Sequence, residues 1–174
     1  MGFFSDWINR IRERRDARAF TQAGILQRAE ENLQSGILTA EGFLGRDPRR
    51  LSRIIREDEF QFQALGLDWS VVEARLEQFL QDGSRGLGEP ITIAGGFLVQ
   101  VAETRGRFVC PWEDGLFLKS SATVRRIDGN GQLFGPRLLF SDLSLHLLKE
   151  HHFLQGKGSP FRLEPEVLKN FLEP

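Results

Sequence analysis

The hydrophobic pattern of this chain changes its period near residue 90, and this change narrows the folds open to it. Up to residue 82 the apolar residues recur every three or four positions, which is typical of helices with one buried face. After residue 90 they alternate with polar residues, which is typical of half-buried strands. The sequence therefore predicts an α+β protein with a helical region at 1–82, a glycine-rich linker at 83–90, and a small antiparallel sheet with two C-terminal helices at 91–174.

The first part of the chain contains several helix boundaries that can be read from capping residues. Thr21 and Asp68 have short side chains that can accept hydrogen bonds from free amides, and proline is favoured in a first helical turn. We expect helices from Gln22 to Gln34, from Asp47-Pro48 to Leu65, and from Asp68 to Gly83.

An apolar stripe near the N-terminus predicts a docking helix. The stripe has helical spacing and consists of Phe3, Phe4, Trp7, Ile8 and Ile11. Because it is short, its pattern favours packing on the same domain or on a protein partner, including a second copy in a homo-oligomer, over binding to a membrane surface. A structural, oligomerising protein is therefore one hypothesis for function.

The second part of the chain predicts short strands and then two helices. The strands are expected at Ile91–Ala94, Phe97–Thr104, Arg107–Cys110, Ser121–Ile127 and Gln132–Phe134. Arg105-Gly106 is interpreted as a turn, and the run from Asp128 to Gly131 as a hairpin turn, since these residue types tolerate a positive φ. Ser141 or Asp142 should begin a helix that Gly156 ends, and Pro165 should begin the last helix.

The charge and cysteine content limit the classes of function. The chain has 23 basic and 24 acidic residues, so its net charge of −1 provides no overall field for nucleic acid or an anionic membrane. The single cysteine, Cys110, excludes an internal disulfide and a multi-cysteine zinc site. There is no long apolar run that predicts a transmembrane segment, and a cytoplasmic location is expected.

A set of short motifs in residues 36–171 resembles a family of uncharacterised bacterial proteins. Its members have a small residue such as glycine where this chain has His152. The resemblance implies no activity, so no catalytic role is carried over from it. The motifs are Gly42–Gly45, Leu65–Leu67, Cys110-Pro111, Ser141–Leu143, His146, Glu150-His151 and Gly156–Arg162.

Cys110 and the histidines are the candidates for metal binding or catalysis. His146 and His151 are five positions apart, which separates them by about 140° around a helix, so we expect no metal site and no cofactor. Glu150 is four positions from His146 and should pair with it. Cys110 beside His146 or His151 would provide the nucleophile and base of a hydrolase or transferase, although a lone cysteine after a strand is usually a buried apolar group.

The glycine-rich turn from Gly156 to Arg162 is the candidate for binding an anion. Its backbone amides at Gly158 and Ser159 and the charges of Lys157 and Arg162 are the groups that recognise phosphate. The alternative is a tight connection between two helices. Our leading hypothesis from the sequence is a non-enzymatic binding module in which this turn, with His146 and Glu150, binds a phosphate-bearing or acidic partner.

Overall fold

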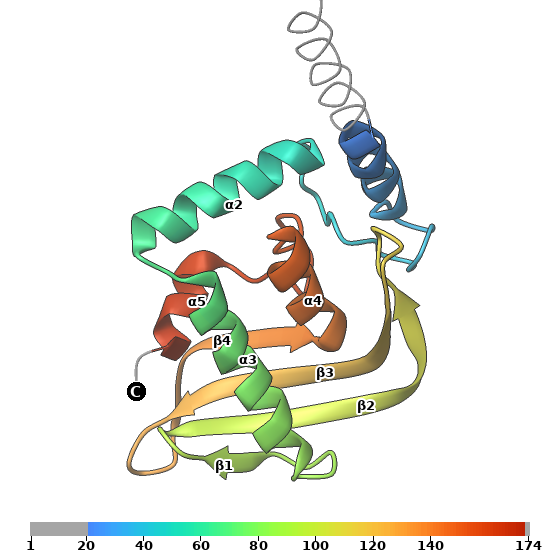
Figure 1. Cartoon of the computed structure of the whole chain (residues 1–174). Helices are drawn as coiled ribbons and strands as arrows, with labels where there is room; N and C mark the ends of the chain where they lie inside the picture. The colour runs from blue at the N-terminus through green and yellow to red at the C-terminus, as the bar shows by residue number, and fades with distance from the viewer. Residues whose placement is uncertain (1–20, 173–174) are drawn as a thin grey trace, which may run out of the picture.

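The computed structural model describes residues 21–172 and has the α+β architecture that the change of period predicts. Residues 21–32 are helical, and the remaining elements follow in the order α2 (Leu51–Leu65), α3 (Trp69–Ser84), β1 (Ile91–Ile93), β2 (Phe97–Val109), β3 (Leu116–Ile127), β4 (Leu133–Ser141), α4 (Asp142–His151) and α5 (Pro165–Leu172) (Figure 1). The apolar stripe from Phe3 to Ile11 lies outside the described residues. None of the described helices is long and apolar enough to cross a membrane.

The four strands form one antiparallel sheet in the order β1-β2-β3-β4. The turn predicted at Arg105-Gly106 is wrong, since these residues form a bulge inside β2, where the pairing with β3 shifts between Thr104 and Arg107. β4 continues to Ser141 although Gly135 and Pro136 resemble strand breakers. It pairs only with β3, and an edge strand tolerates a proline because its outward side needs no ladder hydrogen bond.

The helix boundaries agree with the capping signals in some places and differ in others. Asp68 caps α3 and accepts hydrogen bonds from two backbone amides of the first turn, as predicted. α2 begins at Leu51 rather than at Asp47, because the Asp47 carboxylate accepts hydrogen bonds from the amides of Arg49 and Lys157 instead. α4 ends at His151 rather than at Gly156, since the left-handed backbone of His152 closes it.

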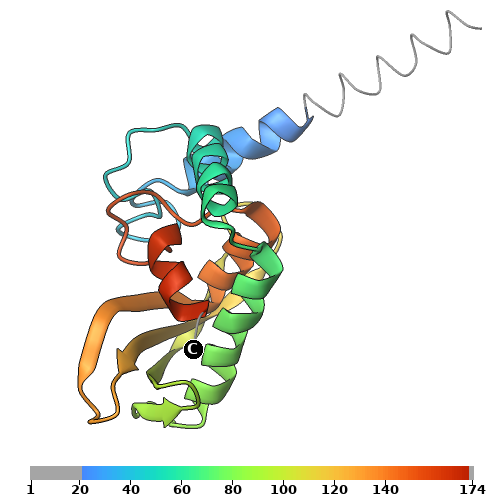
Figure 2. The same ribbon diagram turned by 90° about the vertical axis from the view of Figure 1, so that its left-hand side faces the viewer.

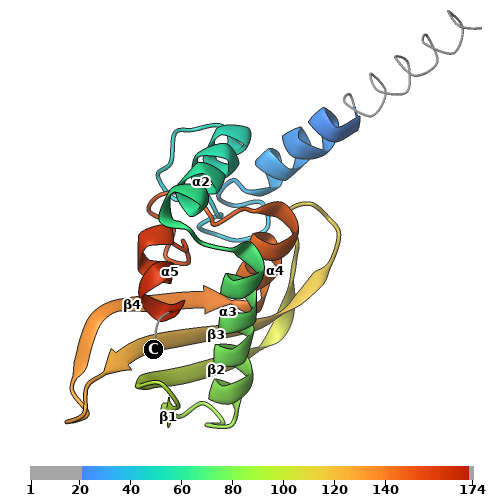
Figure 3. The same cartoon turned by 60° about the vertical axis from the view of Figure 1, so that its left-hand side comes forward.

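The helices α3, α4 and α5 cover one face of the sheet, as Figures 1 and 3 show from two directions. The core below them contains buried side chains from both sides of the glycine-rich 83–90 segment, among them Phe62, Phe79, Phe97 and Phe140. Gly83 lies at this contact. A Cβ atom there would be 2.6 Å from the Val99 side chain, so glycine allows α3 to lie close to β2.

A second core lies at the other end of the molecule, where residues 21–33 and α2 meet α4 (Figure 2). It contains the buried side chains of Leu33, Ile54, Leu147 and Phe153, together with Cys110 at the end of β2. The second core thus places the single cysteine against α4, the helix that carries two of the histidines.

Candidate metal centre

Four side chains with metal-binding atoms converge where the β2–β3 loop meets α4. Cys110 follows β2, Asp114 lies in the loop, and His146 and His151 are on α4. One ligand atom from each of them lies within 4.8 Å of the others. We refer to these four residues as the Cys110 cluster.

The β2–β3 loop has a local geometry that turns Asp114 toward Cys110. The amide of Cys110 donates to the carbonyl of Gly115 over 2.9 Å, and the amide of Glu113 donates to the carbonyl of Cys110 over 2.8 Å. Glu113 has a φ of 64°, a left-handed value that is uncommon for a residue other than glycine. The loop is therefore a tight closure that holds the thiol and the carboxylate on the same side.

The two histidines reach the same carboxylate despite their spacing along α4. The Nε2 atom of His146 lies 3.0 Å from Asp114 Oδ1, and the Nε2 atom of His151 lies 3.0 Å from Asp114 Oδ2. The ring centroids are 5.2 Å apart with an interplanar angle of 80°. Asp114 lies between the two rings. The Nε2 atoms of His146 and His151 therefore meet at one carboxylate, although the two residues are widely separated around α4. His146 bonds to Asp114, whereas the sequence predicted that it would pair with Glu150.

Aromatic side chains hold both imidazole rings in place. Trp112 stacks on His151 with centroids 4.1 Å apart, and Phe117 stacks on His146 at 4.2 Å. Trp112 also contacts Phe153 of the second core at 5.7 Å. The rings therefore have little freedom to turn away, which is the support that a ligand set needs to keep its geometry.

Two members of the cluster, His151 and Asp114, are in the protonation state that a metal requires, whereas the Cys110 thiol is not. Burial lowers the pKa of His151, although Asp114 acts in the opposite direction, so the ring is held in its neutral, ligating form. The pKa of Asp114 is lowered, so the carboxylate is ionised. Burial alone would raise this pKa, but hydrogen bonds from Cys110 and His146 have the larger combined effect. Burial and the neighbouring Asp114 raise the pKa of Cys110 to about 12. The thiol is thus protonated unless a cation binds beside it.

The distances within the cluster approach those of a tetrahedral zinc site without matching them. Zinc–nitrogen bonds of about 2.0–2.1 Å and a zinc–sulfur bond of about 2.3 Å place neighbouring ligand atoms about 3.3–3.6 Å apart. In the cluster, Cys110 Sγ lies 3.6 Å from His151 Nε2, and each histidine lies 3.0 Å from an oxygen of Asp114. The two histidines contact different oxygens of Asp114, and the four ligand atoms spread over as much as 4.8 Å, so zinc binding requires these side chains to move by about an ångström.

The glycine-rich turn lies elsewhere and is bound to the loop at residues 42–47. The Lys157 amide donates to Asp47 over 2.9 Å, and the Gly156 amide donates to the Phe43 carbonyl over the same distance. A Cβ atom on Gly156 would lie 2.2 Å from the carbonyl oxygen of Leu44. The glycine is therefore needed for the close approach of two backbones, and the amides of Gly156 and Lys157 are already used within the chain.

Arg162, the second basic residue predicted to bind an anion, is buried. Its guanidinium makes two hydrogen bonds to the Asp58 carboxylate, of 2.7 and 3.1 Å, and lies 2.9 Å from a carboxylate oxygen of Glu164. The Arg162 and Asp58 side chains are only 3% and 1% exposed. Lys157 is exposed, so the structure does not bring the two cations of the turn to one accessible position.

The third histidine is separate from the Cys110 cluster. His152 has a φ of 49°, and its Nδ1 atom lies 2.8 Å from a carboxylate oxygen of Glu59. Its ring stacks on Trp69 at 4.1 Å, and Trp69 in turn stacks on Phe62 at 3.7 Å. A left-handed position suits glycine, which is the residue that the family resemblance led us to expect there. The stack and the ion pair account for histidine in this chain.

Sequence reasoning identified three members of the cluster as candidates and did not place Asp114 beside them. The signal for it is weak, since it consists only of a carboxylate four positions after the cysteine. Comparisons of the chain with protein-family models, with curated proteins and with solved structures found no match.

Proposed function

We propose that this protein binds one divalent transition-metal ion, with zinc as the best fit, through the Cys110 cluster. The observation that carries the proposal is the convergence, within 4.8 Å, of four ligand atoms from two separate segments of the chain. One thiol, one carboxylate and two imidazoles form a mixed nitrogen, sulfur and oxygen set. Zinc accepts all three atom types in tetrahedral sites, whereas calcium and magnesium require oxygen ligands.

The arrangement supports a structural role for the ion. Protein atoms can fill all four positions of a tetrahedron, and a closed set is typical of structural zinc, while catalytic zinc keeps one position for water. Bound there, the ion would fasten the β2–β3 loop to α4 at the edge of the second core. Asp114 is the most exposed ligand, with a side chain that is 41% exposed against 14% for His146 and 12% for His151.

The alternative is a metal-free hydrolase or transferase in which Cys110 is the nucleophile. The 3.6 Å distance between Cys110 Sγ and His151 Nε2 supports it. The state of the thiol favours the metal instead, because a group with a pKa of about 12 has almost no thiolate at neutral pH. A bound cation is what would turn this thiol into a ligand.

The test is the metal content of protein purified without a histidine tag. We expect about one zinc per chain by mass spectrometry of the metals, and visible absorption typical of four-coordinate cobalt after cobalt substitution. Cys110→Ser and His146→Ala should lose both signals. His152→Ala is the matched control, since it removes a histidine of α4's C-terminal cap that lies outside the cluster, and it should keep them.

Two outcomes would contradict the proposal. The first is wild-type protein that takes up neither zinc nor cobalt. The second is equal metal content in His146→Ala and His152→Ala, which would place the ion elsewhere. Turnover of an ester or thioester by metal-free protein that is lost in Cys110→Ser would support the enzyme instead.

A further inference from the structure

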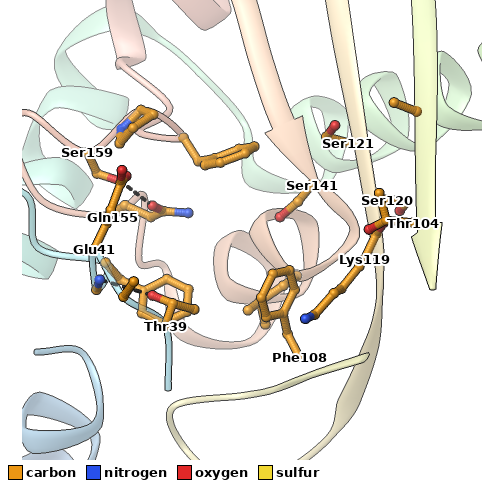
Figure 4. Close-up of a pocket in the computed structure, with 17 residues that line it drawn as sticks. Thr39, Glu41, Thr104, Phe108, Lys119, Ser120, Ser121, Ser141, Gln155 and Ser159 are labelled. Carbon is orange, nitrogen blue, oxygen red and sulfur yellow. Dashed lines mark hydrogen bonds between the residues drawn. The ribbon is translucent and has the colours of Figure 1, made fainter. Parts of the chain in front are cut away.

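A cavity of about 450 Å³ lies between the β2–β3 hairpin and two loops, and no residue of the Cys110 cluster lines it (Figure 4). Small-molecule sites have volumes of roughly 300–1,000 Å³. The walls combine apolar side chains with a few polar groups. The apolar part is formed by Phe43, Phe108, Leu143, Pro160 and Phe161.

Gln155 is a buried polar group on one wall of the cavity. The residue is only 4% exposed, and its φ of 70° is uncommon outside glycine, so the surrounding structure holds it in place. Its Oε1 accepts a hydrogen bond from the Ser159 hydroxyl over 2.6 Å, and its Nε2 donates to Ser144 over 3.3 Å. The amide nitrogen points toward the cavity (Figure 4), and only one of its two hydrogens has a partner among the described residues.

The opposite wall has two polar groups that form no hydrogen bond or ion pair with residues 21–172. Ser120 is 8% exposed, and its hydroxyl makes no hydrogen bond with any residue from 21 to 172. The Lys119 ammonium lies 5.0 Å from the centroid of the Phe108 ring and makes no ion pair with a carboxylate in this part of the chain. The Lys119 ammonium thus has an aromatic ring but no carboxylate as its neighbour, so its charge is available to a bound anionic group beside the Ser120 hydroxyl.

We propose that this cavity binds a small monocarboxylate with an aromatic or branched aliphatic body. The carboxylate lies against Lys119 and Ser120, and the body lies against Phe108 and Leu143. Lys119 is the single cation of the lining, which suits one negative charge rather than a phosphate dianion. Glu41 lies on the far side of the cavity from Lys119 (Figure 4) and disfavours a second acidic group there.

The probe for the test is 4-phenylbutyrate, with 4-phenylbutyramide and 4-phenylbutylamine as analogues of equal length that differ in charge. Binding is measured by titration with amide chemical shifts as the readout. We expect saturable binding of the carboxylate, with shifts at residues 119–121 and 155, and at least about tenfold weaker binding of the other two compounds, since a charge-assisted contact is lost.

Two variants and two controls locate the contact. Lys119→Gln should weaken binding about tenfold, and Ser120→Ala several-fold. Lys157→Gln removes an exposed cation of the glycine-rich turn and should have no effect. Binding that persists in the presence of a chelator shows that the carboxylate is not a ligand of a metal in the cluster.

Each remaining result would overturn the proposal. These results are the absence of saturable binding by folded wild-type protein, equal affinity for the neutral amide, unchanged affinity in Lys119→Gln, or loss of binding in Lys157→Gln or in the presence of a chelator. Thermal unfolding of every variant establishes that a loss of binding is not a loss of fold.

Discussion

The Cys110 cluster and the glycine-rich turn both contain the residue types of a binding site, but they differ in how those residues are used. In the turn, the Lys157 amide and the Arg162 guanidinium are bound by carboxylates of the same chain. In the cluster, the thiol, the carboxylate and two imidazoles contact one another, and one ligand atom from each lies within 4.8 Å of the others. The comparison teaches that a candidate site depends on which groups the fold brings together: the turn pairs its buried cation, Arg162, with a carboxylate, whereas the cluster gathers several metal-binding atoms in one place.

The largest expected effect tests whether Arg162 is structural. Arg162→Met leaves Asp58 buried without its cation and should lower the free energy of unfolding by about 3–5 kcal/mol. The double variant Asp58→Leu, Arg162→Met should recover most of this loss. Urea denaturation provides the measurement. A loss below about 1 kcal/mol, together with weaker binding of phosphate, would instead return Arg162 to the role of an anion ligand.

The same variant has a pH dependence with a definite sign. Burial raises the pKa of Asp58, and Arg162 opposes that shift. In Arg162→Met only the charge of Arg49 still opposes burial and Glu164, so the folded state favours the protonated carboxyl more strongly than in wild type. The stability deficit should therefore be largest at neutral pH and should shrink as pH falls toward the raised pKa. A deficit that grows on acidification would contradict this assignment.

The proposed zinc site at the Cys110 cluster provides the second expected effect. An ion that binds only the folded state at 100 times its Kd adds about 2.7 kcal/mol, which for a chain of this size raises Tm by roughly 5–10 °C. Thermal unfolding with zinc and with a chelator should show this difference in wild type and in His152→Ala. Cys110→Ser should show almost none. An equal effect of zinc on Cys110→Ser would mean that the metal binds outside the cluster.

The fold was largely predictable from local signals. The Asp68 cap, the proline at the start of α5 and the hairpin turn after Asp128 are decided within four or five residues, and each was predicted. The errors at Asp47 and at Gly156 have a common cause. Both residues serve the contact between two loops that are over 100 positions apart, and that contact is invisible to local reading.

The candidate site was less predictable for the same reason. Cys110, His146 and His151 were named from residue type, but the geometry was judged from α4 alone. Asp114 comes to α4 only because β3 pairs with β2 and Asp142 binds the amide of Leu118 at the start of β3. A spacing argument within one helix cannot include a ligand that a neighbouring hairpin supplies.

The smallest expected effect tests whether Gly156 serves close backbone packing or anion binding by the glycine-rich turn. Gly156→Ala places a Cβ atom 2.2 Å from the Leu44 carbonyl oxygen, so the two loops must move apart, at a cost of about 1–3 kcal/mol. Gly129→Ala is the matched control, since its Cβ meets no atom within 4 Å, and it should change stability by less than about 0.5 kcal/mol. If the turn instead exists to bind anions, Gly156→Ala should unfold like wild type in urea and lose only its affinity for phosphate.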